Sequence, residues 1–210
     1  MKGKFQTILG EPLPKSFYAR DTKLVAMNLL GKVLVHQTDD GLVKGRIVET
    51  EAYYGPGDPA SHAFRGKTKR SAIMWGEPGT AYVYFTYGMH YILNVVTEEE
   101  GKAGAVLIRA LEPIQGIEVM RKRRGVNNVI ELCNGPAKLT QAFGINGRYN
   151  GADLTSGNLI IEEGDEKKFD IVSTGRIGIK KGREEKLRFY IRGCEFVSKK
   201  EEKDAKRDKN

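Results

Sequence analysis

Four polar residues interrupt apolar runs that otherwise read as buried strands. They are Glu49, Glu51, Asn94 and Arg109. Burying a carboxylate is costly unless its charge is paired, so side chains of this kind inside a sheet need a reason. If their strands are neighbours, an acid, an amide and a guanidinium converge on one polar site. This convergence predicts a functional site built around Glu51, which stands among tyrosines at the end of its strand.

The two carboxylates are open to more than one interpretation. Glu49 and Glu51 are two residues apart on one strand and therefore share a face, roughly 6.5–7 Å apart. That separation suits the acid and base of an inverting glycoside hydrolase. Alternatively, one carboxylate is structural and the other is a general base. Arg109 fits either a catalytic role or a purely structural ion pair.

Aromatic side chains crowd the same segments. Tyr82 and Tyr84 share one face of a strand and Phe85 points to the other, so one face packs in the core while the other walls a pocket. Tyr87 and Met89 stand at the tip of the hairpin that follows, where a wedge into a base stack would explain such large side chains. The aromatic residues of these segments are Tyr53, Tyr54, Tyr82, Tyr84, Phe85, Tyr87 and Tyr91.

A loop rich in glycine and proline occupies residues 55–80, and its length is typical of functional loops. It holds His62 and a string of basic residues that either grips phosphates or is merely solvated: Arg65, Lys67, Lys69 and Arg70. The chain has no glycine-rich nucleotide fingerprint, no phosphate-binding loop and no histidine or cysteine spacing typical of a metal site. We therefore expect neither a cofactor nor a metal.

The overall charge favours a polyanionic partner. The 210 residues include 35 Lys and Arg against 27 Asp and Glu, a formal net charge of +8, which favours nucleic acid without establishing it. The two cysteines, Cys133 and Cys194, form neither a disulfide framework nor a zinc spacing. No apolar run is long enough to span a bilayer or to act as a signal peptide, so we expect a cytoplasmic location.

Turn residues and periodicity predict an α+β fold in which strands outnumber helices. Asp21 suits an N-cap and Gly31 a C-terminal stop for the first helix, and Pro136 suits the first position of the last one. We expect helices at 22–30, 114–124 and 137–143, and strands at 32–38, 42–53, 81–86, 90–96, 104–111, 158–162, 169–173 and 187–192. Residues 199–210 are almost entirely charged and are expected to form a solvated or disordered tail.

Several short motifs occur together in one order. They are Glu-Thr-Glu-Ala-Tyr at 49–53, Gly-Pro at 55–56 with Asp58 and His62, Pro-Gly-Thr at 78–80, Tyr-Val-Tyr at 82–84, Tyr-Gly-Met at 87–89, Asn94, Arg-Ala-Leu-Glu-Pro at 109–113, Gly-Pro at 135–136 with Lys138 and Leu139, and Arg-Phe-Tyr at 188–190. In this order the chain resembles 3-methyladenine DNA glycosylases of the alkyladenine glycosylase type, from about the first helix to Val197. The resemblance implies a single compact α+β domain at 1–198, with a curved, mainly antiparallel sheet, surrounding helices and a protruding β-hairpin.

The resemblance also implies an activity and its catalytic residues. Glu51 matches the general base that activates water, and Arg109 matches the arginine that holds this water near the acid. The backbone carbonyl of Ile177 matches a further contact to the water. The activity implied is hydrolysis of the N-glycosidic bond of alkylated or deaminated purines, flipped out of duplex DNA, with no lyase step.

A base pocket is implied by the same resemblance. Tyr53 and His62 match one wall of this pocket, and Tyr84 matches the opposite wall. In the family, the main-chain N–H at the His62 position helps to read the purine edge. Asn94 matches the residue that disfavours guanine by crowding its exocyclic amine.

Further residues match positions that face DNA. Tyr87 matches the side chain that enters the duplex where the flipped nucleotide was, and Met89 and His90 flank this wedge. Arg70 lies in the pocket loop and is expected to contact DNA. This loop reads Thr-Lys-Arg-Ser at 68–71, where the family often has Thr-Pro-Arg-Asn.

The expected partner is double-stranded DNA that contains damaged purines, bound by a monomer, associated with the nucleoid if the source is prokaryotic. No membrane partner is expected. Two alternatives remain open at this point. One is a non-catalytic nucleic-acid-binding module in which the acid–arginine pair is only structural. The other is a carbohydrate hydrolase that uses Glu49 and Glu51 together.

Overall fold

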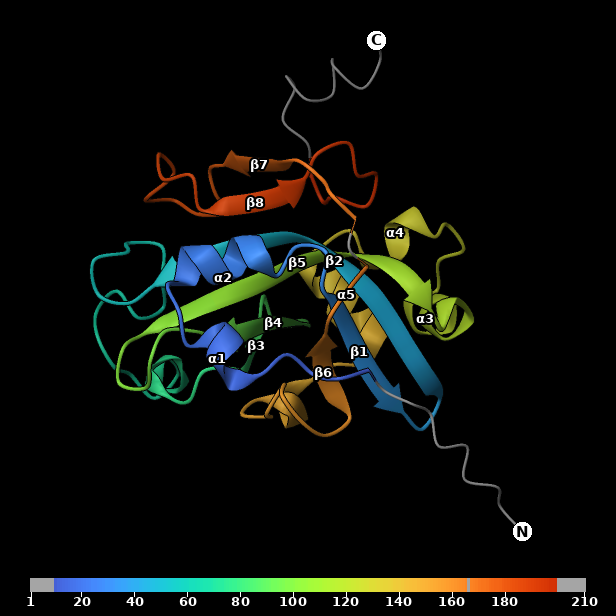
Figure 1. Cartoon of the computed structure of the whole chain (residues 1–210), viewed down its shortest axis with the longest axis horizontal. Coiled ribbons are helices and arrows are strands. Elements are labelled where there is room, and N and C mark those ends of the chain that lie inside the picture. The colour runs from blue at the N-terminus through green and yellow to red at the C-terminus, as the bar shows by residue number, and fades with distance from the viewer. Residues whose placement is uncertain (1–9, 166, 200–210) are drawn as a thin grey trace.

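One long strand organises the sheet. The computed structural model describes residues 10–165 and 167–199, and within them strand β2 (Gly41–Tyr54) pairs with three other strands. Those that complete the sheet are β1 (Val33–Thr38), β3 (Ala81–Thr86), β4 (His90–Val96), β5 (Gly104–Gln115), β6 (Leu159–Glu162), β7 (Ile171–Thr174) and β8 (Arg188–Ile191). Their order is β3-β4-β5-β2-β1-β6, with β8 also paired to β2 and β7 paired to β8 (Figure 1).

Strand β2 bends near its middle, and the bend curls the sheet. The first half of β2 pairs with β1 up to Arg46, and the second half pairs with β8 from Glu49 to Glu51. Its register against β5 shifts on both sides of Glu49. Irregularities of this kind bend a strand and re-aim its side chains. Both carboxylates therefore lie where the antiparallel sheet curls into a half-barrel.

Helices cover the sheet in two places. They are α1 (Lys15–Tyr18), α2 (Thr22–Asn28), α3 (Ile117–Arg124), α4 (Ile130–Cys133) and α5 (Pro136–Phe143), with 3₁₀ helices at Ala72–Trp75 and Gly147–Tyr149. Helix α2 packs on β2 and β5, and α5 packs on β4 and β5. As expected, Asp21 caps α2 by accepting a hydrogen bond from the Leu24 N–H at 3.0 Å, and Pro136 opens α5.

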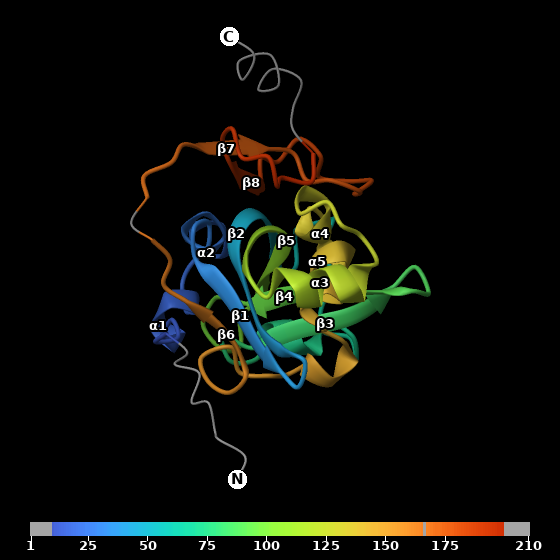
Figure 2. The ribbon, with the colours of Figure 1, turned by 90° about the vertical axis from the view of Figure 1, so that its right-hand side faces the viewer.

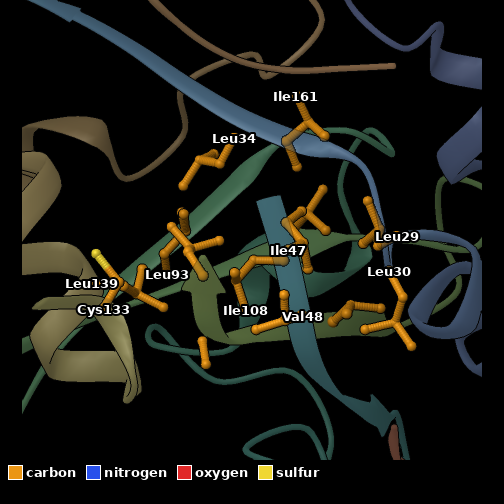
Figure 3. Close-up of a cluster of buried hydrophobic side chains, with 14 of the residues drawn as sticks. Leu29, Leu30, Leu34, Ile47, Val48, Leu93, Ile108, Cys133, Leu139 and Ile161 are labelled. Carbon is orange, nitrogen blue, oxygen red and sulfur yellow. The ribbon is translucent and has the colours of Figure 1, made fainter. Parts of the chain in front are cut away.

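The hydrophobic core fills the space between the sheet and these helices. Leu29, Ile47 and Ile108 are fully buried in it, and full burial of such a side chain contributes about 1.5–3 kcal/mol. The residues labelled in Figure 3 are Leu29, Leu30, Leu34, Ile47, Val48, Leu93, Ile108, Cys133, Leu139 and Ile161. This packing holds β2, β4 and β5, which carry the polar residues, in one register.

The β3–β4 hairpin projects from the body of the molecule (Figure 2). At its tip, the Met89 N–H donates to the Thr86 carbonyl at 3.3 Å, and φ is 50° at Tyr87 and 68° at Gly88. Positive φ at both central residues is typical of the tight hairpin turn that prefers Asn-Gly. Holding a tyrosine there costs about 1–3 kcal/mol, and strain of this kind clusters at functional positions.

The sequence predicted the fold class correctly. A single compact α+β domain with a curled antiparallel sheet and a protruding hairpin is confirmed. Of the tail expected at 199–210, only Lys199 lies within the described residues. No helix in the described part of the chain combines the length and apolar character needed to cross a bilayer.

The predicted boundaries were less accurate. The helix expected at 114–124 begins only at Ile117, because β5 continues to Gln115. Between them Gly116 adopts a φ of 76°, and a Cβ there would lie 2.4 Å from the Leu42 carbonyl oxygen. The helix therefore cannot start before this glycine. The four-residue helices α1 and α4 were not predicted, because they are too short to give a periodic pattern.

Candidate active site

Glu51 is fully buried, and two hydrogen bonds and one ion pair hold its carboxylate. Its Oε1 accepts the main-chain N–H of Ile177 at 2.7 Å. Its Oε2 accepts the Tyr53 hydroxyl at 2.8 Å and lies 3.2 Å from Arg109 Nη1. A carboxylate has about four lone-pair sites, so Glu51 keeps room for one further donor. Ile177, expected to act through its carbonyl, contacts Glu51 through its N–H.

Glu49 has a different environment. Its Oε1 accepts Arg109 Nε at 2.9 Å, Arg188 Nε at 2.8 Å and the Ser198 hydroxyl at 2.8 Å, and its Oε2 accepts the Ser198 N–H at 2.7 Å. These donors match the capacity of about four lone pairs of a carboxylate. Glu49 is therefore a structural acid, and this does not support the alternative in which Glu49 and Glu51 act as a hydrolase pair.

Arg109 connects the two carboxylates because of the strand register. Ile108 pairs with Thr50 and Ala110 pairs with Glu49, which places Arg109 between the acids. Burial opposes the charge of Arg109, but Glu51 and Glu49 outweigh this effect and raise its pKa. The guanidinium therefore stays charged.

Burial raises the pKa of Glu51 above its ordinary value, and the charge of Glu49 adds to this rise. Arg109, the Ile177 N–H and the Tyr53 hydroxyl act in the opposite direction without cancelling it. Burial and the neighbouring Glu51 raise the pKa of Tyr53 well above its ordinary value, so its hydroxyl keeps the proton that it donates. A buried carboxylate with a raised pKa is suited to accept a proton near neutral pH.

A cavity of about 360 Å³ opens beside this network. Pockets for small ligands start at about 300 Å³, so a single purine base fits this space. All three residues that bind the Glu51 carboxylate, Tyr53, Arg109 and Ile177, line the cavity, and Glu51 therefore lies directly behind its wall. The predicted site residues that line it are Tyr53, His62, Tyr84, Tyr87, Asn94, Arg109 and Ile177.

His62 and Tyr84 lie together on one wall of the cavity. Their ring centroids are 4.8 Å apart, which is too close to admit another ring between them. His62 was expected on the side of Tyr53, opposite Tyr84, and its position differs from that expectation. His62 Nδ1 lies 2.9 Å from the Tyr82 hydroxyl. Desolvation and the Arg70 cation lower the pKa of His62 to about 4, so its ring is neutral at neutral pH.

Tyr53 is backed by an arginine to which the sequence interpretation gave no role. Arg176 Cζ lies 4.7 Å from the Tyr53 ring centroid, and the guanidinium binds both oxygens of Asp58, at 2.6 and 2.7 Å. Asp58 also accepts the N–H groups of Tyr54 and Ala60. This ion pair ties the glycine-rich loop to the segment after β7. Asp58 belonged to a recognised motif, but a partner 118 positions away leaves no local signal.

Asn94 is fixed within the hairpin. Its Nδ2 donates to the main-chain carbonyl of Tyr82, at 3.1 Å, across the β3–β4 pair. The amide is buried yet reaches the cavity wall. Its position therefore does not adjust freely to a ligand.

The residues expected to face DNA lie at the rim and beyond it. At the hairpin tip, Tyr87 is 86% exposed and Met89 is 69% exposed, and His90 begins β4. Arg70 stacks on Tyr84, with Cζ 4.7 Å from the ring centroid. Large apolar side chains exposed at a projecting tip are typical of an interaction surface.

Two residues of the network were given no role from the sequence, although one of them, Arg188, opens the recognised Arg-Phe-Tyr motif. Arg188 interrupts an apolar strand as Arg109 does, and this signal would have found it. Ser198 lies in an irregular segment with no comparable signal. Among residues 10–165 and 167–199, no three His, Cys, Asp or Glu side chains are grouped to hold a metal ion.

Comparison with known proteins identifies the class to which this site belongs. The family model for methylpurine-DNA glycosylase (MPG) matches residues 16–195, most of the chain. The chain therefore belongs to the methylpurine-DNA glycosylase family and is a DNA glycosylase, a hydrolase of DNA repair. This membership disfavours both alternatives, the non-catalytic binding module and the carbohydrate hydrolase.

The alignments with individual relatives cover nearly the whole length of each relative. A protein of Carboxydothermus hydrogenoformans is 53% identical over 190 residues, covering 90% of this chain and 99% of the relative. One of Chlorobium phaeobacteroides is 49% identical over 190 residues, covering 90% and 96%. One of Methanoculleus marisnigri is 48% identical over 191 residues, covering 89% and 98%. Each bears the name "Putative 3-methyladenine DNA glycosylase".

The structural assignment of Glu49 is testable by stability. Glu49→Gln is expected to lower the free energy of unfolding by about 3–5 kcal/mol, because it leaves Arg109 and Arg188 buried with too little negative charge. Urea denaturation followed by circular dichroism measures this loss. Glu163→Gln is the control, since Glu163 pairs with Lys32 while 67% exposed and such surface pairs contribute little. Equal losses in the two variants would contradict the assignment.

Proposed function

We propose that this glycosylase removes alkylated or deaminated purines from double-stranded DNA by turning the damaged nucleotide out of the helix and hydrolysing its N-glycosidic bond with water activated by Glu51. The observation that carries the proposal is a buried carboxylate with a raised pKa behind a purine-sized cavity lined by its own hydrogen-bond donors. No lysine is among the described residues that line the cavity, which fits hydrolysis without a lyase step.

Access to the glycosidic bond requires the nucleotide to leave the duplex. The exposed Tyr87 at the projecting tip would refill the stack that the nucleotide vacates, and Met89 and His90 would flank it on the backbone side. The net charge of +8 supports binding to phosphates irrespective of sequence. We propose that the protein works as a monomer on DNA in the cytoplasm, or in the nucleoid of a prokaryotic cell.

The extruded purine would stack between Tyr53 and the wall formed by Tyr84 and His62. Base–aromatic stacking is worth about 1–3 kcal/mol per base. Asn94, held in place by its bond to β3, would crowd the exocyclic amine of guanine. The name borne by the relatives makes 3-methyladenine the first substrate to examine.

The chemistry assigned to Glu51 is that of a general base. The carboxylate takes a proton from water, the water oxygen bonds to C1′, and the electron pair of the C1′–N bond leaves with the base. The same negative charge stabilises the positive character that develops on the sugar. Arg109 and the segment at Ile177 position the water, and the Ile177 carbonyl remains a proposed further contact. A 3-methyl or 7-methyl purine departs as a neutral base, because it is cationic beforehand.

The base assignment is tested by Glu51→Gln. Removing the proton acceptor is expected to slow single-turnover excision from a methylated duplex by about 10²–10⁴-fold, with lesion binding retained in a gel-shift assay. Glu131→Gln, which changes an exposed glutamate in α4, provides the matched control. Excision by Glu51→Gln at the rate of the control would refute the assignment.

The pH dependence supplies a second test. Glu51 must be ionised to accept a proton, and burial raises its pKa above 4.5. Excision of 7-methylguanine, which leaves without needing an acid, is therefore expected to rise with pH along a limb whose midpoint lies above 4.5. Arg109 and Tyr53, which face the carboxylate, have raised pKa values and do not explain an acidic limb. A midpoint at or below 4.5 would speak against Glu51.

The proposed role of the Tyr87 ring in excision can be tested separately from its effect on the stability of the turn. Tyr87→Asn creates the Asn-Gly pair that this turn prefers, so the melting temperature is expected to stay the same or rise. Duplex excision is expected to fall by about tenfold or more as the ring that offsets a few kcal/mol of unstacking is lost, and 2-aminopurine fluorescence beside the lesion should report reduced flipping. Tyr87→Phe, which keeps a ring, should remain near wild type. Full activity in Tyr87→Asn would exclude a wedge.

A further inference from the structure

An arginine stands behind each aromatic wall of the cavity. Arg176 lies 4.7 Å from the Tyr53 ring centroid, and Arg70 lies 4.7 Å from that of Tyr84. Tyr53 and Tyr84 both line the cavity, whereas neither arginine is among the described residues that do so. Both guanidinium groups therefore lie outside the space where a base would stack.

The two arginines differ in charge compensation. Arg176 is buried and binds both oxygens of Asp58, so its charge is neutralised where it stands. Arg70 is exposed, and none of the ion pairs formed within the described residues includes it. The wall formed by Tyr84 and His62 is therefore backed by an uncompensated positive charge.

Arg70 is held in this position by its neighbours in the chain. The Thr68 N–H donates to Ser71 Oγ at 3.0 Å, and the Ser71 N–H donates to Thr68 Oγ1 at 3.2 Å. The Ala72 N–H closes the turn by donating to the Thr68 carbonyl at 2.8 Å. Ser71 is fully buried. These bonds fix the backbone on both sides of Arg70. Its charge also contributes to lowering the pKa of His62.

We propose that Arg70 sets the charge preference of the base pocket by stabilising negative charge on the departing purine through the Tyr84 ring. This inference rests on the proposed excision reaction and adds a specificity-determining residue to it. A base stacked on the inner face of Tyr84 would lie about 8 Å from the Arg70 cation, near enough for a Coulomb effect at a partly desolvated site. The effect has opposite signs for neutral and cationic lesions.

The sign follows from the electron balance of the reaction. When C1′–N9 of a neutral lesion such as hypoxanthine breaks, the electron pair leaves with the base, which becomes an anion until solvent protonates it. The Arg70 cation stabilises this charge. A cationic lesion such as 7-methylguanine departs neutral, so Arg70 gives no such benefit and instead repels the bound base. Arg70 therefore favours excision of neutral lesions.

The test compares two lesions under single-turnover conditions with saturating enzyme. The measured quantity is the excision rate of hypoxanthine divided by the excision rate of 7-methylguanine. Arg70→Gln is expected to lower this ratio by about 3- to 10-fold, the size of a screened charge effect at this distance. Arg65→Gln is the control, because Arg65 is an exposed basic residue of the same loop and its loss should change both lesions alike. Thermal melting checks that each variant is folded.

Several results would overturn the role of Arg70. One is an equal loss for both lesions in Arg70→Gln, which would make it an ordinary phosphate contact. Another is a wild-type enzyme that excises 7-methylguanine but not hypoxanthine. An equal shift of the ratio in Arg65→Gln would show a general charge effect. Excision of neither lesion by the wild type would overturn the role of Arg70, and failure to excise 3-methyladenine as well would overturn the proposed function itself.

Discussion

A single buried guanidinium makes the rest of the site possible. Two carboxylates two residues apart on a buried strand repel each other, and without a cation at least one of them takes up a proton. Arg109 lies 2.9 Å from Glu49 and 3.2 Å from Glu51, and its charge opposes the rise in the pKa of Glu51 without cancelling it. Because Glu49 also binds Arg188 and Ser198, it anchors Arg109 firmly. Glu51 shares the same cation but has fewer donors, so it retains the capacity to take a proton. The number of donors, rather than the residue type, separates the structural acid from the one that we propose as the base.

The parts of this site that follow from local chemistry could be predicted from the sequence. A polar side chain in an apolar strand needs a partner, so the acid, amide and guanidinium were expected to meet, and the structure brings them together. The start of α2 and both ends of α5 were predicted because their caps are local, whereas α2 stops at Asn28, two residues before the expected end. By contrast, the function of Glu49 depends on Arg188 and Ser198, which follow it by 139 and 149 positions. The start of α3 depends on Gly116 and its contact with a distant strand. No local pattern encodes either feature.

The ion pair of Arg176 and Asp58 explains how irregular segments form a defined cavity wall. The glycine-rich loop and the segment after β7 have little regular structure, yet the pair joins them at 2.6 and 2.7 Å with neither side chain more than slightly exposed. The residue after Arg176 supplies the N–H that binds Glu51. One ion pair therefore orients the Tyr53 ring and holds a donor to the carboxylate. The positions of the side chains in the site therefore depend on buried ion pairs between loops as well as on the sheet.

The β3–β4 hairpin couples the cavity to whatever binds at its tip. Strand β3 carries Tyr82 and Tyr84 into the cavity wall and ends at Thr86, just before Tyr87, while β4 returns with Asn94 opposite Tyr82. These side chains share two short paired strands, so the tip and the cavity wall belong to one hairpin. The left-handed conformation of Tyr87 is a cost that a turn of Asn-Gly would avoid. A chain under selection for stability alone has no reason to keep a tyrosine there. Its exposed ring, for which the fold itself gives no reason, is consistent with the wedge that we propose.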